Sequence, residues 1–256
     1  MKIFETHAHL DLKDFNKDRA RVIEQSRKAG VEYLIDIGYN QETSENAIKL
    51  AAEYDFIYAS VGYHPHDATE FDSQVVRDLA QENKVVAIGE IGLDYYRNLS
   101  PKKIQQRVFA QQIEIAKQLD LPIIVHDREA HEDCFNILKE SNAKHVVFHC
   151  FSGDVVFAEQ VLEEGWKLSI TGTVTFKNNQ TLRDVVRMLP EDSFFIETDS
   201  PYLTPVPHRG KRNAPFYLPL VIEEISRVRM ESPNKVAEMT FNNAVKFFFT
   251  NKIKIK

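Results

Sequence analysis

Two histidines separated by one residue stand near the start of the chain, in the stretch Phe4 to Asp11. If a strand begins at Lys2, the two-residue period of side chains places His7 and His9 on one face, roughly 6 to 7 Å apart. Two imidazoles on one face can bind one metal ion, but an isolated pair of this kind is more often found on the surface. The pair therefore has to be judged together with ligand-type residues further along the chain.

Four such residues each follow a short apolar run, namely Glu90, His126, His149 and Asp199. Imidazoles and carboxylates bind divalent transition metals, and one glutamate can place its two oxygens on two ions. A lone histidine after a strand is usually structural, but two on consecutive strands favour metal binding. A buried Asp199 without a cation would carry a large desolvation cost. Together these residues predict a metal centre.

Such residues need a scaffold that gathers strand ends, and the hydrophobic pattern indicates one. Eight apolar runs of strand length alternate with segments of helical period. The predicted strands cover residues 2–6, 32–37, 56–61, 85–91, 121–126, 145–149, 166–171 and 194–199. The predicted helices cover residues 17–29, 42–54, 73–82, 101–119, 132–140, 155–164, 180–188, 216–228 and 234–249. Ser100 before Pro101 is the expected N-cap of the fourth helix.

Strands that alternate with helices predict parallel pairing through right-handed crossovers. Eight such units in 256 residues have the size of a closed (β/α)8 TIM barrel, so we expect residues 1–256 to form a single α/β domain. An open doubly wound sheet is the rival. The barrel is favoured because the ligand-type residues follow the first, fourth, fifth, sixth and eighth strands, and only a closed ring brings first and last together.

The composition, with 43% hydrophobic and 27% charged residues, is that of an ordinary globular protein, with disorder expected only in residues 252–256. No signal-peptide pattern and no run near ~18 apolar residues occurs, so we expect a cytoplasmic protein without membrane contact. Cys134 and Cys150 are then expected to be free thiols. The net charge of −6 argues against a basic surface coat for nucleic acid, but two divalent cations would make the site locally positive.

Seven motifs follow one another along the chain. They are THAHLD at 6–11, VGYHPHD at 61–67, GEIGLDYY at 89–96, IVHDRE at 124–129, FHCFSG at 148–153, ETDSPYL at 197–203 and RGKRN at 209–213. As an ordered set they closely resemble the TatD-type metal-dependent deoxyribonucleases, which are amidohydrolase-like barrels. The resemblance implies a two-metal site and hydrolysis of phosphodiester bonds in DNA, as by an exonuclease.

The resemblance also implies a set of metal ligands, which are His7, His9, Glu90, His126, His149 and Asp199. His7, His9 and Asp199 share the first ion. His126 and His149 bind the second ion, and Glu90 bridges the two ions. We expect metal-assisted hydrolysis in which Asp199 accepts a proton from the attacking water, with Glu90 as its catalytic partner. The ligand types suit Zn, Mn or Ni, with Mg as a further candidate. Glu197 is expected either to orient a histidine or to form a salt bridge.

Substrate contacts are expected from two other segments. By resemblance His64 contacts the substrate or its phosphate and His66 is a second candidate, although Pro65 also fits a rigid turn. The basic loop at 207–213 follows Asp199, so we expect Arg209 and Arg212 to contact phosphates of a DNA strand that is single or frayed at its end. A solvated loop is the ordinary alternative. No obligate protein partner is inferred.

Two positions depart from the family pattern. Ala214 stands where a glutamate is common, and this difference concerns the conformation of the basic loop and its substrate preference. Glu5 stands where an aspartate is common, and we expect this difference to change only packing near the barrel floor. A second hypothesis is an amidohydrolase-like enzyme that cleaves an amide or ester, such as a D-aminoacyl-tRNA deacylase. Many such enzymes bridge their metals with a modified lysine on strand four, where this chain has Glu90, so the nuclease is favoured. A non-catalytic binding module is the third hypothesis.

Overall fold

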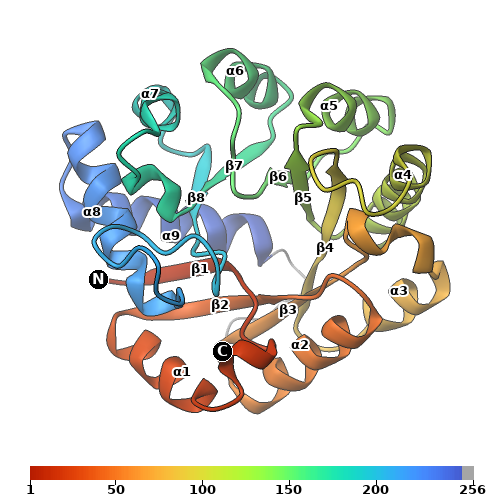
Figure 1. Ribbon diagram of the computed structural model, residues 1–256, viewed down its shortest axis with the longest axis horizontal. Helices are drawn as coiled ribbons and strands as arrows, with labels where there is room; N and C mark the ends of the chain where they lie inside the picture. Colours follow the sequence, from red (N-terminus) through yellow and green to blue (C-terminus); the bar gives the residue numbers. More distant parts are fainter. Residues whose placement is uncertain (250–256) are drawn as a thin grey trace.

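The chain folds into a ring of parallel strands surrounded by helices (Figure 1). The computed structural model describes residues 1–249, so the disorder predicted for residues 252–256 lies outside the described residues. The strands are β1 (Ile3–Ala8), β2 (Val31–Ile37), β3 (Ile57–Val61), β4 (Val85–Asp94), β5 (Ile123–Arg128), β6 (Val146–Phe148), β7 (Lys167–Ile170) and β8 (Phe194–Ile196). Each strand pairs in parallel with the next one in sequence. The predicted eight-stranded barrel is confirmed.

The helices fall where the hydrophobic period predicts them. They are α1 (Arg19–Lys28), α2 (Gln41–Glu53), α3 (Ser73–Leu79), α4 (Lys102–Leu119), α5 (His131–Glu140), α6 (Val155–Glu163), α7 (Gln180–Met188), α8 (Leu218–Arg229) and α9 (Pro233–Phe248). The predicted N-cap of α4 is wrong. Pro101 holds the cap position in an extended conformation, and the Ser100 hydroxyl instead donates to the carbonyl of His66 at 2.8 Å.

The ring closes between β1 and the segment that follows β8. The backbone N–H of Asp199 donates to the carbonyl of His7 at 3.0 Å, and that of His9 donates to the carbonyl of Ser200 at 2.9 Å. Ala8 and Ser200 also form a parallel bridge. These bonds bring the first and last ligand-type residues of the chain onto adjacent backbone segments.

Aromatic side chains fill the opposite end of the barrel, where the strands begin. Phe4 of β1 and Phe195 of β8 both pack against Phe248 of α9, with ring centroids 6.0 and 5.7 Å away. In Figure 1, α9 crosses behind β1 and β8, and it packs against both strands. This apolar floor leaves the carboxyl ends of the strands as the polar end of the barrel.

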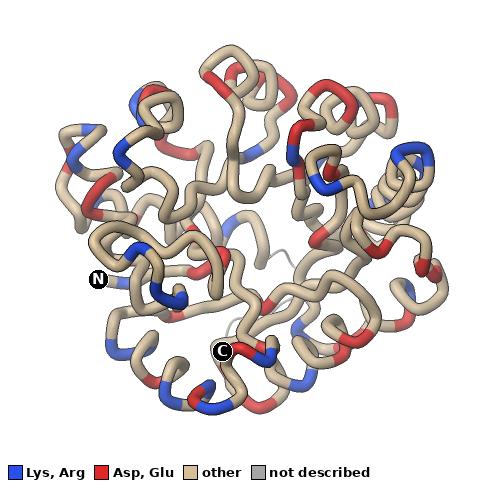
Figure 2. The backbone as a smooth tube through the Cα atoms, in the orientation of Figure 1, with Lys and Arg blue, Asp and Glu red and all other residues tan. Residues whose placement is uncertain are grey.

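The outer surface carries charges of both signs. Figure 2 shows acidic and basic residues interspersed along the ring of helices. Among residues 1–249, no helix is both long and apolar enough to cross a membrane.

Candidate metal centre

The first strand brings two buried imidazoles to the polar end of the barrel. His7 lies in β1 and is fully buried, and His9 just beyond it is 4% exposed. His9 donates from Nδ1 to the carbonyl of Ile37 at 3.1 Å, which leaves the lone pair of Nε2 free. Both ring nitrogens of His7 are buried without a hydrogen-bond partner among the described residues. Because an unpartnered buried imidazole is costly, His7 fits the role of a metal ligand.

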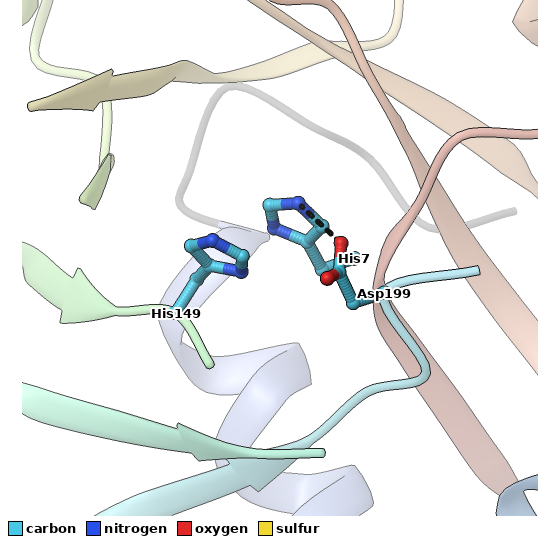
Figure 3. Close-up of side chains that lie close together, drawn as sticks. All are labelled: His7, His149 and Asp199. Carbon is cyan, nitrogen blue, oxygen red and sulfur yellow. Dashed lines mark ion pairs between the residues drawn. The ribbon is translucent and has the colours of Figure 1, made fainter. Parts of the chain in front are cut away.

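Two carboxylates approach these imidazoles. Nε2 of His7 lies 3.5 Å from Oε2 of Glu90 and 3.8 Å from Oδ1 of Asp199. Nε2 of His9 lies 3.8 and 3.5 Å from the same two oxygens. Ligands about 2.1 Å from one ion are about 3.0 to 3.4 Å apart, so a slight contraction would let all four atoms bind one cation. Figure 3 shows His7 facing Asp199, with His149 beside it.

The second oxygen of Glu90 faces a different group of histidines. Oε1 lies 2.6 Å from Nδ1 of His126, 2.9 Å from Nε2 of His149 and 3.7 Å from Nε2 of His64. The two oxygens of one buried carboxylate therefore face two separate sets of donor nitrogens. This is the geometry required of a carboxylate that bridges two cations.

The carboxylates make the centre favourable for positive charge. Burial lowers the pKa of His9, but Asp199 and Glu90 outweigh it and raise that pKa to about 9. Burial raises the pKa of Glu90, but His149 and His126 outweigh it and hold the pKa well below its usual range. Glu90 is therefore an anion at neutral pH, in the state that binds a metal.

In two histidines of this group, His149 and His126, the ring nitrogen that faces away from Glu90 contacts another carboxylate. Nδ1 of His149 lies 3.2 Å from Oε1 of Glu197, which also accepts the backbone N–H of Cys150 at 2.6 Å. Nε2 of His126 lies 3.3 Å from Oδ2 of Asp94. Carboxylates placed in this way set the tautomer and the ring orientation of metal-binding histidines. Of the two roles expected for Glu197, the structure shows the contact with a histidine.

The pair His64 and His66 differs from the pair on β1. Nδ1 of His64 accepts the backbone N–H of His66 at 3.1 Å, so a neutral His64 carries its proton on Nε2. Burial lowers the pKa of His64 well below its usual value, with a further lowering by His126, so the neutral form is the relevant one. His64 is close enough to Glu90 and His126 to form a metal-ligand group with them. In its neutral form, however, Nε2 carries the proton, so this nitrogen donates a hydrogen bond and has no lone pair for a metal. His66 points its Nε2 at Asp94, 2.9 Å away.

Glu5 has a larger role than the expected packing near the barrel floor. It is fully buried in β1 and accepts hydrogen bonds from His7 N–H and from both the N–H and the hydroxyl of Thr198. Burial raises its pKa to about 8, although these hydrogen bonds oppose the rise. The carboxyl group thus ties the backbone of β1 to the residue that precedes Asp199.

The two arginines of the basic loop do not line the cleft above the metal centre. Arg212 binds both carboxylate oxygens of Asp18 at 2.9 and 2.8 Å, and its guanidinium lies 4.4 Å from the ring centre of Phe15. Arg209 donates to the carbonyl of Thr204, and its guanidinium lies over Phe176. Their positions therefore give no support to the predicted phosphate contacts.

The cleft itself has a volume of about 720 Å³ and opens directly above Glu90 and Asp199. Its described lining includes Arg97, Arg128 and Tyr202, which the sequence analysis did not select. One signal could have found the arginines, because Arg128 is the last residue of β5 and Arg97 follows β4 by three positions. Residues at these strand ends face the functional end of a barrel.

The comparison with protein families decides the classification. Residues 4–249 match the family model described as TatD related DNase. The chain belongs to the TatD-related DNase family. Membership confirms the predicted class of enzyme, a metal-dependent hydrolase acting on ester bonds, and the centre described above fits divalent metals.

Individual TatD-related proteins agree with this classification. The chain is 43% identical to an uncharacterized metal-dependent hydrolase, YabD, of Bacillus subtilis, over 97% of this chain and all of the relative. It is 38% identical to a protein of Rahnella sp. named 3'-5' ssDNA/RNA exonuclease TatD, over 96% and 98% of the two chains. The crystal structure of the TatD homologue YJJV from Escherichia coli superposes with a TM-score of 0.92 at 30% identity, over 97% and 98% of the two chains.

Proposed function

We propose that this TatD-related hydrolase is a two-metal exonuclease that removes nucleotides from the end of single-stranded DNA. The observation that carries the proposal is the position of Glu90, whose Oε2 faces His7 and His9 while Oε1 faces His126 and His149. Family membership supports a nucleic-acid substrate, and the name of the Rahnella relative supports a single strand.

The proposed ligands divide into two sets that share Glu90. Nε2 of His7 and of His9, with Oδ1 of Asp199, would hold one cation, and Nδ1 of His126 with Nε2 of His149 would hold the other. Divalent ions bound there would activate water and neutralise charge on a phosphate. The mixed nitrogen and oxygen donors suit Zn, Mn or Ni, and Mg remains a candidate.

The protein groups around the ligands then have separate tasks. Asp199 keeps 15% of its side chain exposed at the cleft, whereas His7 is fully buried, so its Oδ2 can accept a proton from the attacking water. Glu197 and Asp94 hold His149 and His126 in their orientations. His64 lines the cleft beside Glu90, and its Nε2–H would donate to a phosphate oxygen of the substrate.

The proposal is tested with protein reconstituted separately with each candidate metal. We expect single-stranded DNA labelled at its 3' end to release labelled mononucleotide, and we expect Glu90→Gln to release none. The same strand labelled at its 5' end shows the direction of attack. Hydrolysis of small amides or of aminoacyl esters without any release from DNA would overturn the proposal in favour of amidohydrolase chemistry.

A further inference from the structure

Most arginines of this protein are already engaged in the folded chain. Among the described residues, every arginine except Arg97, Arg107 and Arg128 donates a side-chain hydrogen bond or forms an ion pair, as Arg209 and Arg212 do. Arg97 and Arg128 are exposed and line the cleft above the metal centre, whereas Arg107 lies outside it on α4. The lining holds no described lysine. The unengaged guanidinium groups are thus concentrated at the site of hydrolysis.

The loop between β4 and α4 presents Arg97 in a fixed position. The buried amide of Gln105 donates to the carbonyls of Asp94 and Ser100, and the backbone N–H of Arg97 donates to Asp94 at 2.7 Å. These hydrogen bonds hold the backbone of the loop, while the side chains of Arg97 and Leu99 remain exposed. Leu99 on the same loop is 66% exposed and lines the cleft. Such rigid support lowers the entropic cost of binding a ligand.

Arg128 reaches the same rim from the end of β5. Its guanidinium lies 4.1 Å from the ring centre of Tyr96, which is itself 57% exposed. A guanidinium stacked on an aromatic face keeps its N–H donors free at the edge of the plane. The arginines of this rim are therefore suited to the oxygens of a phosphate group.

An aromatic residue occupies the opposite rim, beside Asp199. The backbone of Tyr202 is fixed, because its N–H donates to the carbonyl of Asp199 at 2.9 Å and its carbonyl accepts from Asn213 at 2.6 Å. The side chain nevertheless remains 55% exposed and lines the cleft. An exposed aromatic ring on a fixed backbone is a stacking platform for a nucleobase.

We propose that these two rims bind one nucleic-acid strand across the metal centre, an inference that rests on the proposed exonuclease function. Arg97 and Arg128 bind the phosphate next to the scissile one, and Tyr202 stacks on the base of the terminal nucleotide. The assignment follows from connectivity. A terminal nucleotide is joined to the strand only through the scissile phosphate, so the next internucleotide phosphate belongs to the retained strand. A paired base would have to leave its helix to reach Tyr202, so the arrangement selects single strands.

The arginines are tested by comparing two substrates. Thymidylyl-thymidine has only the scissile phosphate, whereas a thymidine decamer has the adjacent one as well. We expect the ratio of kcat/KM for decamer over dinucleotide to fall roughly tenfold or more in Arg97→Ala/Arg128→Ala, because the charge-assisted contacts are lost. The slope of log KM against log salt should become shallower by ~0.7 for each lost contact. Arg107→Ala removes the same charge outside the cleft and should keep the wild-type ratio, and metal content should be equal in all three proteins.

Tyr202 is tested with a decamer that ends in an abasic residue. The wild-type protein should prefer the normal decamer by roughly fivefold to a hundredfold, the size expected of one stacked base. Tyr202→Ala should lose this preference and Tyr202→Phe, which keeps the ring, should retain it. Equal cleavage of a blunt duplex and a single strand would overturn the inference. It would also fail if the arginine double variant kept the substrate ratio of Arg107→Ala. Absence of cleavage of every strand by the metal-loaded wild type would instead refute the proposed function.

Discussion

Glu5 accepts two hydrogen bonds from Thr198, one from the backbone N–H at 2.9 Å and one from the hydroxyl at 2.7 Å. Together with a third from His7, they join the first strand to the residue before Asp199. Glu5→Ala leaves these buried donors without their acceptor, so we expect the free energy of unfolding to fall by about 3 kcal/mol. Urea unfolding of the metal-free protein measures the change.

The matched control for this prediction is Glu159→Ala, an exposed glutamate on α6. It should change the free energy of unfolding by less than about 0.5 kcal/mol. Similar losses in both variants would show that the hydrogen bonds of Glu5 do not hold the barrel closed.

The divided contacts of Glu90 predict how metal content responds to substitution. Asp199→Ala should lose the ion next to His9 and keep the other, His126→Ala should do the reverse, and Glu90→Ala should weaken both. Elemental analysis after gel filtration measures the stoichiometry of each variant. His145→Ala, which removes an exposed histidine outside the centre, serves as the control. Full occupancy in Asp199→Ala would refute the assignment of the first ion.

Removal of metal should also destabilise the fold, because ions that bind only the folded protein stabilise it. At a free metal concentration 100 times the dissociation constant, the expected contribution is about 2.7 kcal/mol for each site. Treatment with a chelator should therefore lower the melting temperature, and added Zn or Mn should restore it. The shift should be reduced in Glu90→Ala. An identical melting temperature with and without metal would show that the centre does not bind ions under those conditions.

The strands and the ligand-type residues could be predicted from the sequence because both depend on local periodicity. The end of a strand can be recognised where an apolar run stops. Closure of the ring then places His7 near Asp199, and this prediction does not depend on the conformation of any loop. The tasks of Glu197 and Asp94 are less accessible to such reasoning. A carboxylate near a strand end can bind a metal, a histidine or an arginine, and only the packed structure shows which group it faces.

The residues that line the cleft rim could not be predicted for a related reason. The basic loop has the composition of a phosphate site, but Arg212 is captured by Asp18, which is 194 positions away in sequence. The β4–α4 loop has no unusual composition, and its shape depends on Gln105 reaching back to Ser100 and Asp94. Long-range side-chain contacts of this kind leave no local pattern.

The ion pair of Arg212 leads to a prediction about pH. Hydrogen bonds from Arg212 and Arg21 hold the pKa of Asp18 down at about 2, below its ordinary value of 3.8. A lowered carboxylate pKa stabilises the fold above the unfolded pKa, and this stabilisation is lost as the pH falls toward 2. Arg212→Ala should therefore raise the pKa of Asp18, as measured by NMR titration. The substitution should lower the free energy of unfolding by less than about 1 kcal/mol at pH 7, and by still less near pH 2.

The same variant separates two interpretations of the basic loop. If Arg212 serves Asp18 alone, KM for single-stranded DNA and its salt dependence should match those of the wild type. A higher KM with an unchanged pKa for Asp18 would show that Arg212 contacts the substrate.

Asp94 provides a test of how the proposed second ion is held. Its Oδ2 lies 3.3 Å from Nε2 of His126 and 2.9 Å from Nε2 of His66, and Oδ1 accepts the N–H of Arg97. In Asp94→Asn the amide oxygen can keep the bond to Arg97, but the amide NH2 then faces the two imidazoles as a donor. His126 would lose the acceptor that sets its tautomer, so affinity for the second ion should fall by about 10- to 100-fold.

Competition with a chromophoric chelator measures both dissociation constants in Asp94→Asn. The first ion, which has no ligand in contact with Asp94, should keep its affinity. Asp127→Asn is the matched control, because Asp127 also follows a ligand on β5 but its side chain bonds to His131. If both substitutions weaken both ions equally, the effect comes from the charge of the cleft. If only Asp94→Asn lowers the affinity for the second ion, the cause is the contact with His126. Asp94 would then set the affinity of that ion without binding it.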